Sequence, residues 1–404
     1  MAIFLEKEFE EAIPKSCKEA IYIASDVASN SKISIFLIGG IVRDLIIGNE
    51  VKDIDIAVEG DAVDFAKILE KNHYCKVLNI QENLRTAKVL FSNGCVIDFA
   101  STREEKYISS GILPVAYNFG CNLELDIKRR DFTINTLALA LTGSNKYSLV
   151  DFCGGYDDIL NKQIRILHKN SFIDDPSRII RALKFKMRFS FDYEEETYLL
   201  MQKYLDNVSN SMPLERIKGE LKQYFAIEKE NLFEEFLDTN SYKLFSDVAI
   251  DLIDYKRIQQ MNIDKSELWF VYLVLLVINS SFSLERLNLT AYEKKIIKEV
   301  NELFMDKVEN YSDYELYRRF SGLIDLSIKI YYVLTGDNAV YKFFDELKHI
   351  KVKINGKDLI DLGFKPSPFF NEIFDKILRE KINGNITTKK EEIGFVKNCI
   401  KKEE

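Results

Sequence analysis

Two aspartates separated by one isoleucine, Asp53 and Asp55 in "DIDIAV", are candidates for metal-dependent chemistry. In a β-strand, residues i and i+2 point to one face, so both carboxylates would project together while Ile54 and Ile56 face the core. Two Mg²⁺ ions shared by such carboxylates could activate an attacking hydroxyl group and stabilise a leaving pyrophosphate. A solvated strand face would explain these two aspartates alone equally well.

The residues just ahead of the aspartates are suited to phosphate binding. Gly39 and Gly40 follow the apolar stretch "ISIFLI", and glycines there let backbone N–H groups approach triphosphate oxygens. Arg43 would add charge-assisted donors from the start of a helix. A simple Gly-Gly turn is the alternative, and a dinucleotide-binding fold is disfavoured because the G-x-G-x-x-G spacing is missing.

A second group of charged residues lies in "SRIIRALKFKMRF". At 3.6 residues per turn its basic residues fall on one side of a helix, and its aliphatic residues take the opposite side. The pattern predicts an amphipathic helix whose cationic face is turned toward a cleft, although a solvated basic face would look the same. The basic residues are Arg178, Arg181, Lys184 and Arg188.

The elements that must position these residues change character along the chain. β-branched runs alternate with turn residues up to about residue 150, which predicts a small mixed sheet; the runs are "ISIFLIGG", "DIDIAVEG", "AKVLF", "CVIDFAS" and "LVDFCGG". Among them "DAVDFAKILEKNH" has helical spacing and opens with a capping aspartate. From about residue 156 the pattern is helical, until "INGKDLIDLGFKPSPFF" indicates a turn before one last helix. The fold class is therefore α+β, a mixed-sheet head followed by an all-α body.

Composition limits the possible partners. The 404 residues carry a net charge of -8, so any nucleic acid must be bound through local basic patches. No apolar run approaches the roughly 18 residues of a membrane span, and the start lacks the pattern of a signal peptide. We therefore expect a cytoplasmic protein without a membrane partner. The six cysteines and three histidines form no zinc pattern, and we expect free, partly buried thiols.

The stretch "GGIVRDLIIGNEVKDIDIAV" resembles the opening motif of the class II nucleotidyltransferases. This group contains the tRNA CCA-adding, CC-adding and A-adding enzymes and the bacterial poly(A) polymerases. Further stretches resemble motifs of the group in the same order: "LELDIKRRDFTINTLAL", "DFCGGYDDILNKQIRIL", "SFIDDPSRIIRALKFKMRF", "PLERIKGEL" and "INGKDLIDLGFKPSPFF". The likeness spans nearly the whole chain.

The resemblance implies a set of site residues. Asp53 and Asp55 would ligate Mg²⁺, and Asp98 in "CVIDFAS" is a candidate third carboxylate, although a lone strand aspartate is as often merely polar. The nucleotide would be bound by Gly39, Gly40, Arg43, Arg130, Asp131, Asn135, Asp175, Arg178, Arg181 and Lys184. Arg130 would donate to phosphate, Asp131 and Asn135 would bind ribose hydroxyls, and Asp175 with Arg178 would read the base. An Arg–Asp surface pair and an ordinary helix N-cap before Pro176 are the alternatives for Asp131 and Asp175.

Two departures from the group bear on this site. Lys184 stands where arginine is usual, which keeps the charge but loses the planar fork. Asp174 stands where glutamate is usual, a variant that is frequent in the A-adding branch of the group that the chain resembles. Both substitutions lie in the stretch that would select the base.

The resemblance also implies an architecture and an activity. Residues 1–152 would form the catalytic head, 153–228 the neck, 229–310 the body, and 311–404 a tail that binds tRNA. The protein would add CMP, AMP or both, from CTP and ATP, to the tRNA 3′ end with Mg²⁺ and without a nucleic-acid template. The alternatives are an A-only or CC-only enzyme, a poly(A) polymerase, and an RNA-binding homologue without activity. Intact Asp53 and Asp55 disfavour the last of these.

Overall fold

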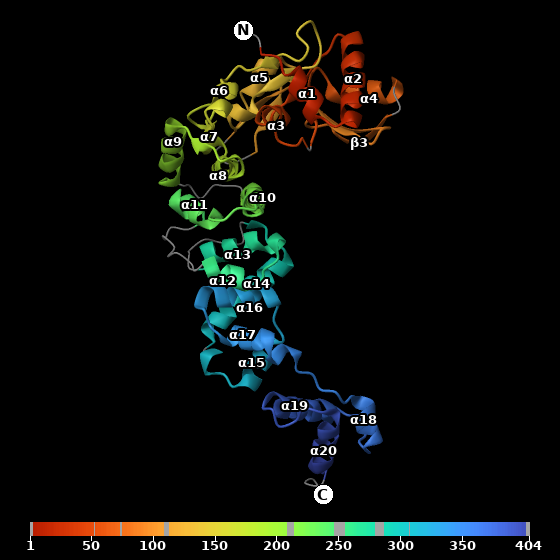
Figure 1. The fold of residues 1–404 in the computed structure, drawn as a ribbon, viewed down its shortest axis with the longest axis vertical. Coiled ribbons are helices and arrows are strands. Elements are labelled where there is room, and N and C mark those ends of the chain that lie inside the picture. Colours follow the sequence, from red (N-terminus) through yellow and green to blue (C-terminus); the bar gives the residue numbers. More distant parts are fainter. Residues whose placement is uncertain are drawn as a thin grey trace. The chain divides into compact units, whose positions relative to one another are not determined.

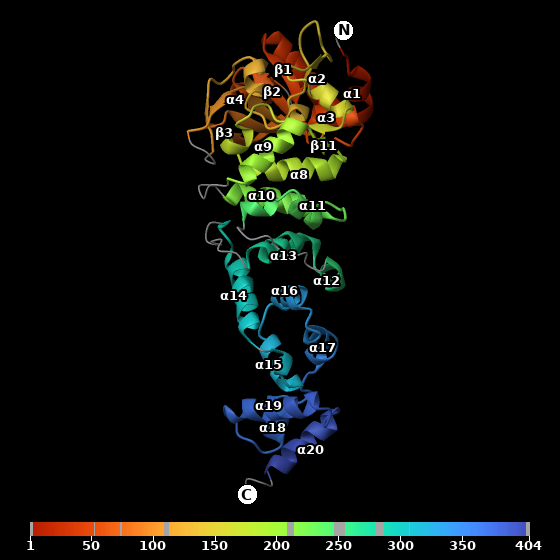
Figure 2. The same ribbon diagram turned by 90° about the vertical axis from the view of Figure 1, so that its left-hand side faces the viewer.

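The computed structural model describes residues 3–51, 53–72, 75–108, 113–207, 214–245, 255–278, 287–306 and 308–400. The chain divides into two compact units, residues 1–244 and 245–404 (Figures 1 and 2). The four-part division into head, neck, body and tail remains a prediction.

Unit 1 is built on a seven-stranded mixed sheet in the order β3-β4-β5-β2-β1-β8-β9. β2 and β5 are parallel, and the other neighbouring strands are antiparallel. The predicted mixed sheet is confirmed, with two strands that the sequence pattern did not indicate, β3 and β8. The strands are β1 (Ser34–Ile38), β2 (Asp55–Glu59), β3 (Cys75–Gln81), β4 (Thr86–Phe91), β5 (Val96–Ser101), β8 (Ala138–Ala140) and β9 (Leu149–Val150).

Two smaller sheets and a set of helices complete unit 1. β6 (Glu104–Lys106) pairs with β7 (Val115–Tyr117), and β10 (Gln163–Ile164) pairs with β11 (Asp192–Tyr193). The helices are α1 (Glu6–Ala12), α2 (Lys15–Asn30), α3 (Gly40–Ile47), α4 (Ala62–Asn72), α5 (Leu123–Ile127), the 3-10 helix η1 (Thr133–Asn135), α6 (Gly155–Leu160), α7 (Ser171–Asp174), α8 (Ser177–Phe189), α9 (Glu195–Leu205), α10 (Leu214–Phe225), α11 (Leu232–Asp238) and η2 (Ser241–Leu244). The predicted capping aspartate of α4 is confirmed, because Asp61 Oδ1 accepts the Val63 and Asp64 N–H groups.

The alternation of side chains along the central strands decides which of them reach the site. The Phe99 ring of β5 packs on Phe65 of α4, with 5.4 Å between ring centroids. Ala57 of β2 packs on the cluster that contains Leu123 and Ile127 of α5. Asp55 is two residues from Ala57 and shares its face. The chain that leaves α5 is therefore on the same side of the sheet as Asp55.

The expectation of free thiols is wrong for one pair of cysteines. Cys17 of α2 and Cys95, just before β5, form a disulfide with their Cα atoms 5.2 Å apart. The pairing could not be read from the sequence because 78 residues separate the two cysteines. Cys75, Cys121 and Cys153 are free and partly buried, as predicted.

The regular secondary structure in the described residues of unit 2 is entirely helical, which confirms the all-α second half. Its helices are α12 (Tyr255–Gln260), α13 (Lys265–Val277), α14 (Ala291–Met305), η4 (Val308–Asn310), α15 (Asp313–Phe320), α16 (Asp325–Thr335), α17 (Ala339–Asp345), η5 (Leu347–His349), α18 (Gly356–Asp361), α19 (Phe369–Ile382) and α20 (Lys389–Ile400). Two helices, not one, follow the break at residues 362–368. Within the described part of the chain, no helix has the length and apolar character needed to cross a bilayer.

Candidate active site

A cavity of about 880 Å³ lies in unit 1. Its walls come from the β1–α3 turn, β2, β5, the segment after β5, η1, α8 and α10, so it gathers residues from most of the predicted motifs. Seven arginines and four carboxylates line it, which makes the wall cationic in a protein of net charge -8. They are Arg43, Arg103, Arg129, Arg130, Arg178, Arg181, Arg216, Asp55, Asp98, Glu105 and Asp131.

The two carboxylates from the sheet stand side by side. Asp55 is the first residue of β2 and is the direct register partner of Asp98 on the parallel strand β5. Asp55 is an exposed residue, but loss of hydration at the cavity wall and the negative charges of Asp98 and Asp53 raise the pKa of Asp55 above its usual value. A carboxylate surrounded by other carboxylates is stabilised by a cation, so these side chains suit a divalent metal ion.

The predicted arrangement of the aspartate pair needs one correction. Ile54 and Ile56 are buried and Asp53 and Asp55 are exposed, as the alternation requires. Asp53, however, precedes β2 instead of lying within it, and it does not line the cavity.

The partner that Asp98 has in this structure was not predicted from the sequence. Lys88 of β4 is the register neighbour of Asp98, and its Nζ lies 3.0 Å from Asp98 Oδ2. Among the described residues, no three His, Cys, Asp or Glu side chains are grouped so as to hold a metal ion. A metal ion bound to Asp55 and Asp98 would therefore take further ligands from the nucleotide and water.

The glycine turn brings backbone close to an arginine. Gly39 has φ +78°, a conformation that favours glycine, and a Cβ there would lie 3.2 Å from Arg130 Nη1. Arg130 Nη2 donates to Asp126 Oδ2 at 2.9 Å. Gly39, Gly40 and Arg130 all line the cavity, which is the arrangement that the phosphate-binding prediction requires.

Arg43 is held by the protein itself. Its Nη1 donates to Asn135 Oδ1 at 2.5 Å, its Nε donates to Asp44 at 3.0 Å, and its guanidinium stacks 4.4 Å from the centre of the Phe189 ring. The side chain is only 4% exposed. In this arrangement Arg43 fixes Asn135, and few of its donors are left for a nucleotide.

Asp131 and Asn135 form a buried pair at the cavity wall. Asn135 Nδ2 donates to Asp131 Oδ1 at 3.0 Å, and Arg181 Nε donates to Asp131 Oδ2 at 2.7 Å. Burial alone would raise the pKa of Asp131, but Arg181 and Asn135 outweigh it and hold the pKa at about 2. The alternative of a surface Arg–Asp pair is excluded by this burial.

The basic residues of α8 divide into two groups. Arg178 and Arg181 line the cavity, whereas Lys184 and Arg188 do not. Lys184 Nζ donates to Glu220 Oε2 of α10 at 2.7 Å, and Glu220 Oε1 accepts from Arg181 Nη1 at 2.9 Å. Part of the predicted cationic face of α8 is therefore paired with Glu220 of α10. The helix periodicity showed which residues share a face but not that Glu220 of the neighbouring α10 pairs with two of them.

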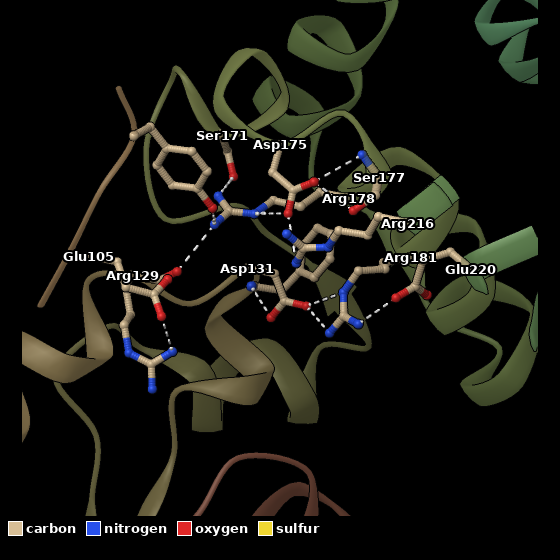
Figure 3. Close-up of polar contacts among 12 residues, drawn as sticks. Glu105, Arg129, Asp131, Ser171, Asp175, Ser177, Arg178, Arg181, Arg216 and Glu220 are labelled. Atoms are coloured by element: carbon tan, nitrogen blue, oxygen red, sulfur yellow. Dashed lines mark hydrogen bonds and ion pairs between the residues drawn. The ribbon is translucent and has the colours of Figure 1, made fainter. Parts of the chain in front are cut away.

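Asp175 is buried and is not one of the residues that line the cavity, but it contacts both the start of α8 and an arginine of the cavity wall (Figure 3). Its Oδ1 accepts from the Ser177 N–H at 3.2 Å and from the Ser177 hydroxyl at 2.6 Å, which is the cap-type contact at the start of α8. Its Oδ2 is 3.8 Å from Arg178 Nε. The side-by-side carboxylate and guanidinium predicted from the i, i+3 spacing are present in the structure.

Several residues of the cavity wall were not predicted from the sequence. Glu105 Oε1 accepts from Arg103 Nε at 3.0 Å and from Arg129 Nη1 at 3.2 Å. Tyr107 follows on the same segment, and Arg216 comes from α10. The dense alternation of charge in "TREEKY", directly after the strand that carries Asp98, was the available signal.

Comparisons with known proteins agree with this geometry. Residues 35–165 match the family described as the poly A polymerase head domain. An A-adding tRNA nucleotidyltransferase of Geobacter sulfurreducens is 29% identical over 91% of this chain and 45% of the relative. One from Halalkalibacterium halodurans is 27% identical over 92% and 90%, and a CCA-adding enzyme of Ligilactobacillus salivarius is 27% identical over 94% and 96%. The chain thus spans less than half the length of the Geobacter relative.

A solved structure of a CCA-adding enzyme in an apo form matches with a TM-score of 0.80 at 24% identity, over 99% of each chain. The mixed-sheet head and helical remainder are therefore the fold of the CCA-adding enzymes. Within the head, residues 35–165 are similar to the poly A polymerase head domain, and the relatives cited above are named tRNA nucleotidyltransferases or CCA-adding enzymes. Nucleotidyltransferases of this kind generally use a divalent metal ion.

Proposed function

We propose that this protein transfers AMP, CMP or both from ATP and CTP to the 3′ end of tRNA, without a nucleic-acid template. The observation that carries the proposal is the register-paired Asp55 and Asp98 on one wall of a cavity whose other walls are rich in arginine. Paired carboxylates suit the metal side of nucleotidyl transfer, and guanidinium groups suit a triphosphate. Relatives named A-adding and CCA-adding enzymes support tRNA as the acceptor.

The reaction we propose is an in-line substitution. The tRNA 3′-hydroxyl loses its proton to water, and its oxygen forms a bond to the α-phosphorus. The bond between the α-phosphorus and the oxygen that bridges to the β-phosphate breaks, and pyrophosphate leaves. Mg²⁺ bound by Asp53 and Asp55, with Asp98 as a candidate third carboxylate, would supply Lewis-acid activation of the hydroxyl and neutralise the developing charge. The separation of Asp53 from the cavity makes Asp55 the stronger of the two assignments.

The remaining wall residues would orient the nucleotide. The backbone at Gly39 and Gly40, with Arg130, would bind the triphosphate. Asp131 and Asn135 would form hydrogen bonds with the ribose hydroxyls. Arg181 keeps Asp131 ionised, and Arg43 fixes the side chain of Asn135. In this proposal Arg181 and Arg43 position these two residues. Lys184 would act through Glu220 and not on the nucleotide.

Asp175 and Arg178 would select the base. Cytosine and adenine both place an amine donor beside a ring-nitrogen acceptor, whereas uracil and guanine place a carbonyl acceptor beside a ring N–H. A carboxylate and a guanidinium 3.8 Å apart fit the first pair and repel the second. This arrangement provides selection without a template.

An enzyme that adds only A is the second candidate. It is favoured by the names of the first two relatives and by Asp174, the variant frequent in the A-adding branch. We place the activity in the cytoplasm, where tRNA is matured. The alternative of a poly(A) polymerase is supported only by the name of the head-domain family. The alternative of an inactive RNA-binding protein is disfavoured because such a protein would not need the cavity carboxylates.

Transfer to defined acceptors tests the proposal. Purified protein, Mg²⁺ and labelled CTP or ATP alone are offered tRNAs that end before the first C, after CC, and after CCA. Addition of C to the first and A to the second indicates a CCA-adding enzyme, and addition of A to the second alone indicates an A-adding enzyme. Addition to none of the acceptors, or repeated addition of A to any RNA, would contradict the proposal.

A further inference from the structure

One aromatic ring of α8 supports an arginine whose hydrogen bonds lead into the cavity. The Arg43 guanidinium lies 4.4 Å from the centre of the Phe189 ring, closer than the 5.4 Å that separates it from the Phe185 ring. A cation is held most firmly over an aromatic face where water is excluded, and the Arg43 side chain is buried. Phe189 itself is half-buried and does not line the cavity.

Arg43 in turn decides how the amide of Asn135 is oriented. The oxygen and the nitrogen of an Asn amide are similar in size, so their hydrogen-bond partners decide which way each points. A guanidinium has only donors, and Arg43 Nη1 donates to Asn135 Oδ1 at 2.5 Å. Nδ2 is thereby turned the other way, where it donates to Asp131 Oδ1 at 3.0 Å.

The remaining hydrogen bonds of this pair leave one amide hydrogen for a ligand. Asp131 Oδ1 also accepts from the Phe132 N–H at 2.8 Å. Asp131 Oδ2 accepts from both Nε and Nη2 of Arg181 (Figure 3). Asn135 Nδ2 carries two hydrogens, and among the residues that the structure describes it donates to Asp131 alone. A ribose hydroxyl oxygen is a suitable acceptor for the second hydrogen.

We propose that Phe189 is a positioning residue for recognition of the sugar: its ring holds Arg43, and Arg43 keeps the second amide hydrogen of Asn135 available to a ribose hydroxyl of the incoming nucleotide. This inference rests on the proposed function. Phe189 does not contact the reacting atoms; it acts through Arg43 and Asn135. The ligand is a ribonucleoside triphosphate, and its 2′-deoxy and 3′-deoxy analogues each lack one of the two candidate hydroxyls.

The test measures the preference for ribose over deoxyribose. Transfer to a tRNA ending in CC is followed with ATP, 2′-deoxy-ATP and 3′-deoxy-ATP. Phe189→Leu keeps an apolar side chain but removes the ring face, so kcat/KM for ATP should fall about two- to tenfold, the size of one weakened hydrogen bond. The analogue that lacks the recognised hydroxyl does not use Asn135, so its value should stay and the ratio should narrow. Phe189→Tyr keeps the ring and should keep the ratio.

A second substitution separates positioning from a general loss of stability. The ratio of two nucleotides on one preparation does not depend on the fraction of folded protein. In an Asn135→Ala background, Phe189→Leu should change the ratio no further, because its effect passes through Asn135. If Phe189→Leu does not fold, Phe189→Met, which is also apolar and has no ring, takes its place.

A matched control lies in α17 of unit 2. Phe344 is also half-buried, and the Lys348 ammonium lies 4.9 Å from the centre of its ring. Phe344→Leu should leave the ratio unchanged. The inference is overturned by an unaltered protein that does not distinguish ATP from either analogue, by an unchanged ratio in Phe189→Leu, or by a further change in the double variant.

Failure of the proposed function gives a different result. In that case the unaltered protein transfers nothing to any tRNA. Equilibrium binding of ATP and its two deoxy analogues, measured without tRNA, then decides the inference separately. A preference for ATP that narrows in Phe189→Leu and persists in Phe189→Tyr supports it, and a preference that is absent or does not change overturns it.

Discussion

Asp55 and Asp98 face the same direction from neighbouring parallel strands because each is the other's register partner. Lys88 continues the row on β4, as the register neighbour of Asp98. Asp55 has a raised pKa, whereas Asp98 is paired with the ammonium group of Lys88. The two acids differ in how readily each would take a metal ion, and Asp55 is the one without a lysine 3.0 Å away.

Asp55→Asn should reduce nucleotide transfer by more than about a hundredfold while tRNA binding is retained. Loss of groups that merely support metal ligands already costs 10–100-fold, and Asp55 would be a ligand itself. Transfer to a tRNA ending in CC and a filter-binding titration measure the two properties. Asp64→Asn, on an exposed aspartate of α4, is the control. Retention of transfer with an unchanged Mg²⁺ requirement would contradict the metal assignment.

Substitutions at Asp175 should separate its two roles. Asn is as good a helix cap as Asp, so Asp175→Asn should keep most of the stability but present an amide donor to the base. Selection of ATP or CTP over UTP and GTP should fall about 5–150-fold, which corresponds to 1–3 kcal/mol. Asp175→Ala should lose the cap as well, at about 1 kcal/mol. Normal selectivity in both folded variants would mean that the base is read elsewhere.

Asp131 should make the stability of unit 1 depend on acid pH. Its pKa in the folded state is about 2, below the value of about 4 expected when unfolded. Its contribution, on the order of 2 kcal/mol, is therefore complete above about pH 4 and is lost as the pH falls toward 2. The free-energy difference between the unaltered protein and Asp131→Asn should shrink over that range, and a constant difference would contradict the interaction with Arg181.

The only tryptophan provides an internal reference for this measurement. Trp269 lies in α13 of unit 2. Where the two units unfold separately, tryptophan fluorescence follows unit 2, and circular dichroism contains the transition of unit 1 as well. Only the circular dichroism transition should shift in Asp131→Asn.

The fold was predictable where each strand has a clear pattern. Runs such as "CVIDFAS" gave β5, but β8 consists of Ala138, Leu139 and Ala140, all buried, so it has neither alternation nor β-branched residues. β3 alternates weakly because most of its residues are exposed at the edge of the sheet. Strands of these two kinds are recognised from the sheet that they join and not from their own residues.

Site residues were predictable when they came from one motif. The i, i+3 pair of Asp175 and Arg178 follows from helix geometry alone. Lys88 and Arg216 depend on which strand or helix lies next to the motif, and spacing along the chain contains no such information. Arg43 lines the cavity, and its assignment to the nucleotide stays a prediction; its contact with Asn135, 92 residues away, could not be predicted from the motif.

Glu220→Gln should destabilise unit 1 by about 2–3 kcal/mol. Loss of one member of a buried ion pair costs 3–5 kcal/mol, and the 27% exposure of the Arg181 side chain reduces this figure. Lys184 would then have the uncharged acceptors Gln223 and the introduced amide in place of its ion pair with Glu220. Urea unfolding followed by circular dichroism measures the change. Glu196→Gln, whose pair with Lys169 is exposed, should cost under about 1 kcal/mol.

Removal of residues 351–404 should weaken tRNA binding far more than ATP binding. Helices α18–α20 enclose their own apolar cluster around Leu359, Ile377 and Val396, so a whole packed layer is deleted. The nucleotide cavity lies in unit 1. Binding of the full chain to tRNA should also weaken steeply with salt. A folded truncation that binds tRNA with full affinity would remove the tail from the RNA-binding surface.

The register of β5 restricts which insertions and deletions the head can tolerate. The turn at Asn93 and Gly94 leads directly into β5, and one residue inserted or deleted between Cys95 and Asp98 would turn the carboxylate into the apolar side of the sheet. β3 already contains a register shift between Val77 and Asn79, which shows that this edge strand accommodates an irregularity. In a library of single-codon insertions and deletions, variants in β3 should therefore survive selection for activity, and those between Cys95 and Asp98 should be absent.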